Sequence, residues 1–199
     1  LAGDTETRVQ VEDIELDAMM FRVVSPRGST GNLPCVIYYH GGCFVSGGFA
    51  THDNQLRQLA WYSGCRVIAV QYRLAPEHTF PAAHNDAESG ANIIWKYAQK
   101  LGVDRGRITL AGDSAGGHLA LVTALRLKAA NQWQPAQLIL IYPMLDDRTD
   151  QVSPVLEPYL VWTVDDNVTG WDALLGDARG GPDVPPSQRM LWIEFGETE

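Results

Sequence analysis

The chain has 199 residues, a formal net charge of −9, 45% hydrophobic residues and 20% charged residues. This length is enough for one sizeable hydrophobic core, and the composition is ordinary for a soluble globular protein. The acidic balance argues against a nucleic-acid partner, because phosphate binding needs a basic surface. The apolar run Leu138–Tyr142 is far too short to cross a membrane, so no transmembrane segment is expected.

The cysteines point to a reducing compartment. There are three of them, Cys35, Cys43 and Cys65, and an odd, low count argues against a disulfide framework. Their spacing matches no zinc pattern, and the five histidines supply no H-E-x-x-H motif. The first residues have neither a basic start nor an apolar stretch, which is unlike a signal peptide. We therefore expect a cytoplasmic protein with no metal and no cofactor.

Short apolar runs alternate with longer helical patterns along the chain, which is typical of a mainly parallel sheet with helices on both faces. The predicted elements, in chain order, are the strands Thr7–Glu12, Met19–Val24 and Pro34–Tyr39, the helix Asn54–Ser63, the strand Arg66–Gln71, the helix Pro81–Lys100, the strand Arg107–Gly112, the helix Ala115–Ala130, the strand Ala136–Tyr142, a short helix around Trp171–Leu175 and the strand Met190–Phe195. The sequence predicts a single α/β domain over residues 1–199, in which 146–186 form an irregular insertion or cap.

The strongest motif is Gly112-Asp113-Ser114-Ala115-Gly116, an instance of G-x-S-x-G. A strand pattern precedes it and a helix pattern follows it, as a nucleophile elbow requires. The serine of such an elbow sits on a tight, strained turn, and the two flanking glycines remove side chains that would clash there. Ser114 is therefore the candidate nucleophile, although a G-x-S-x-G outside this context is usually a plain turn.

A second motif, His40-Gly41-Gly42-Cys43, directly follows the predicted strand Pro34–Tyr39. Consecutive glycines after a strand let backbone N–H groups approach a substrate oxygen closely, as the oxyanion loops of serine esterases do. We expect the N–H groups of Gly41, Gly42 and Ala115 to form an oxyanion hole. A glycine-rich turn after a strand is common, but the two motifs occur here in the expected order.

Three segments together resemble the hormone-sensitive lipase family of α/β-hydrolase carboxylesterases: HGGCFVSGG, VQYRLAPEHTFPAAHNDA and GDSAGGHLA. The resemblance runs continuously from about Val9 to Pro143. It implies the α/β-hydrolase fold, Ser114 as nucleophile, and carboxylic esters with short to medium acyl chains as substrates. It also implies that His40 helps to hold the oxyanion loop and that Tyr72–Glu77 (YRLAPE) braces the loops near the site.

Two residues depart from the family pattern. Cys43 stands where the family usually has Gly or Ala, and a small buried residue is its simplest interpretation. His118 stands where the family often has Asn, four residues after Ser114 on the helix that leaves the elbow. The serine side chain should point away from that helix, so we expect His118 to be a packed or surface histidine and not a general base.

The remaining triad members are expected late in the chain, in the order Ser, acid, His. Glu199 follows the predicted strand Met190–Phe195 and falls on the position that the family gives to the acid, although a final residue is also often a frayed terminus. No histidine lies after His118, so the base is not present in the chain. We therefore expect a chain truncated at its C-terminus, with its last strand, last helix and much of the cap missing.

Two functions remain open on these grounds. The leading one is a serine carboxylesterase that acts on a small-molecule ester through an acyl-enzyme intermediate. The alternative is an inactive fragment or a non-catalytic protein of the same fold that binds a small apolar ligand. The intact elbow favours the first function, and the missing histidine favours the second for this chain. The sequence does not determine the oligomeric state, and a homo-oligomer is possible.

Overall fold

A computed structural model describes residues 7–181 and residue 184. Its centre is a six-stranded sheet in the order β1-β2-β4-β3-β5-β6. The strands are β1 (Val9–Leu16), β2 (Met19–Pro26), β3 (Leu33–Tyr39), β4 (Arg66–Val70), β5 (Val103–Asp113) and β6 (Gln137–Ile141). Strand β2 pairs antiparallel with both β1 and β4, whereas β3, β4, β5 and β6 run parallel to one another.

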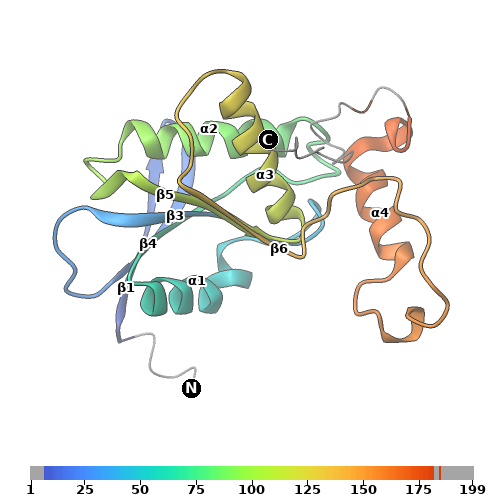
Figure 1. The fold of residues 1–199 in the computed structure, drawn as a ribbon, viewed down its shortest axis with the longest axis horizontal. Helices are drawn as coiled ribbons and strands as arrows, with labels where there is room; N and C mark the ends of the chain where they lie inside the picture. The colour runs from blue at the N-terminus through green and yellow to red at the C-terminus, as the bar shows by residue number, and fades with distance from the viewer. Residues whose placement is uncertain (1–6, 182–183, 185–199) are drawn as a thin grey trace, which may run out of the picture.

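Helices cover both faces of the sheet, as the alternating pattern of the sequence predicts (Figure 1). Helix α1 (Phe49–Ser63) lies on one face, and helices α2 (Ala82–Lys96) and α3 (Ala115–Ala129) lie side by side on the other. Strand β3 shows why two cores result. Val36 and Tyr38 pack on the α1 side, while Ile37 and Tyr39 join the larger core under α2 and α3, because successive strand side chains point to opposite faces.

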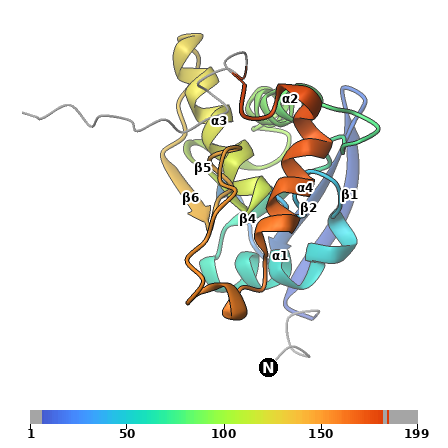
Figure 2. The same ribbon diagram turned by 90° about the vertical axis from the view of Figure 1, so that its right-hand side faces the viewer.

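A fourth helix, α4 (Val164–Leu175), lies beside the sheet at the end where β6 terminates (Figures 1 and 2). The short 3-10 turns η2 (Glu157–Tyr159) and η3 (Gly176–Ala178) lie before and after it. Its N-terminus is capped by Thr163, whose hydroxyl accepts a hydrogen bond from the Asp166 N–H at 3.1 Å while the Asp166 carboxylate accepts one from the Thr163 N–H. The large apolar side chain that anchors α4 is Trp171, which is 1% exposed.

The predicted elements agree with these positions, with shifts at their ends. Helix α1 begins at Phe49 and not at Asn54, because the Thr51 hydroxyl accepts from the Gly48 N–H and closes the first turn early. Helix α2 ends at Lys96 and not at Lys100. Helix α4 begins seven residues before the predicted start at Trp171. The predicted strand Met190–Phe195 lies outside the described residues.

Within residues 7–181 and 184, none of the helices combines the length and the apolar character needed to span a bilayer.

Candidate active site

Ser114 occupies the sharp turn between β5 and α3. Its backbone has φ 54° and ψ −118°, a region that costs a non-glycine residue about 1–3 kcal/mol. Three backbone hydrogen bonds stabilise this conformation: the Ser114 N–H donates to the Ile141 carbonyl at 2.9 Å, and its carbonyl accepts from the N–H groups of His118 and Met144. From Leu110 to Ala124, Ser114 is the single residue that is partly exposed rather than buried. The turn therefore presents this one hydroxyl to solvent.

The two glycines that flank the elbow are required by close backbone packing. A side chain at Gly116 would overlap the carbonyl oxygen of Tyr39 and come within 2.6 Å of the His40 carbonyl. A side chain at Gly112 would overlap the backbone of Gly116 and come within 2.6 Å of the Tyr39 oxygen. The start of α3 thus packs directly on the end of β3, which brings the elbow against the loop formed by residues 40–48, here called the oxyanion loop.

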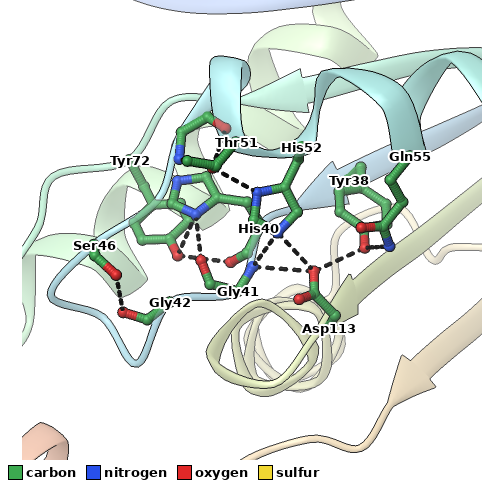
Figure 3. A network of polar contacts seen from close by, with 11 residues as sticks. Tyr38, His40, Gly41, Gly42, Ser46, Thr51, His52, Gln55, Tyr72 and Asp113 are labelled. Carbon is green, nitrogen blue, oxygen red and sulfur yellow. Dashed lines mark hydrogen bonds and ion pairs between the residues drawn. The ribbon is translucent and has the colours of Figure 1, made fainter.

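The carboxylate of Asp113, next to Ser114, fastens this loop to the elbow (Figure 3). Its Oδ1 atom accepts hydrogen bonds from the Gly41 N–H at 3.0 Å and from the Tyr38 hydroxyl at 2.8 Å, and lies 3.5 Å from His52 Nε2 on α1. Gln55 donates to the Tyr38 hydroxyl at 2.6 Å and extends the network along α1. One buried oxygen thereby joins β3, the oxyanion loop, α1 and the elbow.

The hydrogen bonds keep this carboxylate charged in spite of its burial. Burial alone raises the pKa of Asp113, but the contacts with His52, Tyr38 and the Gly41 N–H outweigh it and hold the pKa below its usual value. Tyr38 responds in the opposite sense, since burial and then the neighbouring Asp113 charge raise the pKa of its hydroxyl. Tyr38 is therefore a neutral donor and Asp113 a charged acceptor.

His40 and Tyr72 hold the other side of the oxyanion loop. The His40 Nδ1 atom lies 2.7 Å from the Gly41 carbonyl, and the Tyr72 hydroxyl donates to the His40 carbonyl at 2.7 Å. Their rings stack with centroids 4.3 Å apart, and burial lowers the pKa of His40. This arrangement agrees with the supporting role that the family resemblance implies for His40 and for the segment Tyr72–Glu77.

The prediction that Gly41 donates to an oxyanion conflicts with these contacts, because its N–H is already bonded to Asp113 and lies 3.3 Å from His52 Nε2. The next two N–H groups are different. Within residues 7–181 and 184, the N–H groups of Gly42, Cys43 and Ala115 have no hydrogen-bond acceptor. Gly42 has φ 120°, and Cys43 has φ 56°, so the loop turns sharply directly after Gly41. The sequence alone does not predict which glycine N–H is free. That depends on the hydrogen bond between Gly41 and Asp113, which are far apart in the chain.

His118 is packed, as the sequence predicts, and it forms a buried pair with His84. The Nε2 atoms of the two rings lie 3.0 Å apart, and His118 Nδ1 lies 2.8 Å from the Met144 carbonyl. Because that carbonyl can only accept, His118 carries its proton on Nδ1, and His84 donates from Nε2. Burial lowers the pKa of His118 to about 4 and that of His84 well below its usual value, so the pair is neutral.

No hydrogen bond joins the Ser114 hydroxyl to any residue in the part of the chain that the structure describes. All five histidines lie in this part: His40, His52 and the His84–His118 pair are engaged as described, and His78 is exposed. Glu199, the predicted acid, lies outside the described residues. Across residues 7–181 and 184, no three His, Cys, Asp or Glu side chains are grouped so that they could hold a metal ion.

Comparisons with known proteins agree with this geometry. A sequence family described as alpha/beta hydrolase fold matches residues 36–189. The chain is 33% identical to Carboxylesterase NlhH of Mycobacterium tuberculosis over 174 residues, which cover 80% of this chain and 54% of NlhH. It is 47% identical to Esterase LipI of the same species over 95 residues, which cover 48% of this chain and 30% of LipI.

A solved structure shows the same architecture. The hyperthermophilic esterase from the archaeon Pyrobaculum calidifontis superimposes with a TM-score of 0.82 at 38% identity, and the match covers 94% of this chain and 62% of that one. The chain thus spans less than two thirds of the length of each of these three proteins.

The neutral histidine pair predicts a loss of stability in acid. Unfolded histidine takes up a proton below a pH of about 6.5, whereas folded His118 does so only near pH 4. The stabilisation is therefore complete above about pH 6.5 and is lost as the pH falls towards 4, by on the order of 3 kcal/mol for His118. Melting temperatures between pH 7.5 and 4.5 measure this loss.

His118→Asn should flatten that dependence, because an amide can still donate to the Met144 carbonyl but does not titrate in this range. His78→Asn, at an exposed position, is the matched control and should follow the wild-type curve. The interpretation is wrong if His118→Asn loses stability in acid as steeply as the wild type.

Proposed function

Because this chain belongs to the α/β-hydrolase fold family, we propose that it hydrolyses carboxylic esters, with Ser114 as the nucleophile. The observations that carry the proposal are the strained, partly exposed Ser114 and, within the described residues, the N–H groups of Gly42, Cys43 and Ala115, which have no hydrogen-bond acceptor. A serine on an elbow that packs against a loop with free N–H donors is what an acyl-transfer site needs to stabilise an oxyanion. The names of the relatives, Carboxylesterase NlhH and Esterase LipI, support the same reaction.

The reaction proceeds in two acyl transfers. The Ser114 Oγ atom attacks the ester carbonyl carbon, its proton passes to a base, and the carbonyl oxygen becomes an oxyanion. Collapse of this intermediate breaks the bond to the alcohol oxygen, and the alcohol leaves with the proton from the base. In the second transfer, water attacks the carbonyl carbon of the Ser114 ester while the base takes a proton from the water. The bond to Ser114 Oγ then breaks, Oγ receives that proton, and the carboxylic acid is released.

The oxyanion hole in this proposal consists of the N–H groups of Gly42, Cys43 and Ala115. The donor role that the sequence analysis assigns to Gly41 is here assigned to Cys43. Gly41 contributes indirectly, since its bond to Asp113 fixes the peptide that leads into the two donors. Loss of one such donor costs about 3 kcal/mol of transition-state stabilisation in comparable enzymes. Because Cys43 donates through its backbone, its side chain takes no part in the chemistry.

The base is the part of the site that these 199 residues leave open. None of their five histidines contacts the Ser114 hydroxyl. We propose Glu199 as the acid of the triad, because it falls at the position that the hormone-sensitive lipase family gives to that residue. The absence of a histidine on Ser114 also favours the alternative for this chain taken alone, a non-catalytic protein that binds a small apolar ligand.

The proposed substrates are small esters with short to medium acyl chains, as the resemblance to the hormone-sensitive lipase family implies. The segment 146–186, which contains α4, is proposed as a cap over the site. Its exposed apolar side chains support a role beside an acyl chain, and they include Val155, Tyr159 and Val161.

Ser114→Ala should abolish hydrolysis of p-nitrophenyl acetate and butyrate by the full-length protein. The reason is that the alanine variant has no hydroxyl to form the acyl-enzyme. A fluorophosphonate probe followed by peptide mapping should place its adduct on Ser114, and Ser114→Ala should not label. An adduct elsewhere, or equal hydrolysis by the alanine variant, contradicts the assignment.

The 199-residue chain itself should be a poor esterase, because no imidazole within it is placed to take the Ser114 proton. Removal of a triad member leaves a residual acceleration of about 10³–10⁴ over the uncatalysed reaction. The measurement compares kcat/KM on p-nitrophenyl acetate for this chain and for the full-length protein. Equal values would mean that one of the histidines already present acts as the base.

A further inference from the structure

Helix α4 contacts the oxyanion loop at Gly170, where an added side chain would force a neighbouring atom to move. A Cβ atom added to Gly170 would overlap the Sγ atom of Cys43, and it would lie 3.2 Å from the Cys43 Cβ and 3.4 Å from the Cys43 carbonyl oxygen. Gly170 is buried. The backbone of α4 therefore rests directly on Cys43, a loop residue whose N–H is a donor in the proposed oxyanion hole.

The helix geometry gives no other reason for a glycine here. Gly170 lies well inside α4 (Val164–Leu175), and its φ is outside the left-handed region that favours glycine. In an unobstructed helix, alanine would be more stable than glycine by about 1 kcal/mol. The absence of a side chain at Gly170 makes the close contact with Cys43 possible.

Cys43 and Phe44 both need support, because both have positive φ, 56° and 65°. Consecutive α4 residues supply it. Gly170 covers Cys43, and the Trp171 ring packs on the Phe44 ring with centroids 5.5 Å apart. Burial raises the pKa of the Cys43 thiol to about 11, so the group is a neutral packing element. Position 43 carries a cysteine where the family usually has Gly or Ala, and the helix residue that faces it, Gly170, has no side chain.

We propose that Gly170 is a positioning residue for the oxyanion loop, and that its contact with Cys43 fixes the direction of the Cys43 N–H towards Ser114. The proposal rests on the proposed function, since it assigns Gly170 to the same acyl-transfer site. It follows that an added side chain at position 170 displaces an oxyanion donor while the rest of the substrate site stays in place.

The test measures kcat and KM on p-nitrophenyl acetate with the full-length protein. Gly170→Ala should lower kcat by about tenfold or more, because small displacements of a reacting group cost up to about 10²-fold in rate. KM should stay within about threefold, because the displaced donor acts mainly in the transition state. Thr169→Ala, the exposed neighbour on the same helix, is the matched control and should keep the wild-type kcat.

The same substitution is then made in a Cys43→Ala background, where the overlapping sulfur atom is gone. There Gly170→Ala should change kcat by less than about threefold, because neighbouring sites that share one contact are not additive. Melting temperatures are recorded for every variant. The inference is overturned if Gly170→Ala keeps the wild-type kcat, or if it lowers kcat equally in both backgrounds.

Two further outcomes are also decisive. If Gly170→Ala alone does not fold, a folded and active double variant upholds the inference, and a double variant that is unfolded or inactive overturns it. The Ser114→Ala protein is assayed in parallel. Wild-type activity no higher than that of Ser114→Ala refutes the proposed function itself, whereas an active wild type with an unaffected Gly170→Ala refutes only the role of Gly170.

Discussion

The site depends on the contact between the Asp113 carboxylate and the Gly41 N–H. This one hydrogen bond joins the end of β5 to the loop that follows β3, and it is buried and charge-assisted. Tyr38 and His52 contact the same oxygen, and these contacts hold the pKa of the carboxyl below its usual value. Because Asp113 directly precedes Ser114, this bond ties the oxyanion loop to the residue next to the proposed nucleophile.

The strain in this region is balanced by close packing. Ser114, Cys43 and Phe44 all adopt positive φ, which non-glycine residues avoid. Their surroundings compensate: the start of α3 packs on the carbonyl groups of Tyr39 and His40, and α4 packs on the oxyanion loop from the other side. Among the residues that the structure describes, the N–H groups of Gly42, Cys43 and Ala115 are thus held in place without hydrogen-bond acceptors, which is the condition for binding a developing negative charge.

The sequence predicts the parts of this arrangement that depend on local pattern. Apolar runs such as Pro34–Tyr39 and the glycines around Ser114 identify the parallel strands and the elbow. Features that depend on tertiary contacts are predicted less well. The start of α4 is missed although Thr163 and Asp166 form a capping box, because scattered aromatics obscure the helical period. The donor role assigned to Gly41 stays a prediction, but a carboxylate distant in sequence occupies its N–H in the structure. The acidic residue inside the G-x-S-x-G motif is the sequence signal for that contact.

The most direct test of this account is a crystal structure of the full-length protein with a phosphonate bonded to Ser114. Its phosphoryl oxygen stands in for the oxyanion. The account predicts that this oxygen lies within hydrogen-bond distance of the N–H groups of Gly42, Cys43 and Ala115, while the Gly41 N–H remains on Asp113. A phosphoryl oxygen bound by the Gly41 N–H, with the Asp113 contact broken, would contradict it.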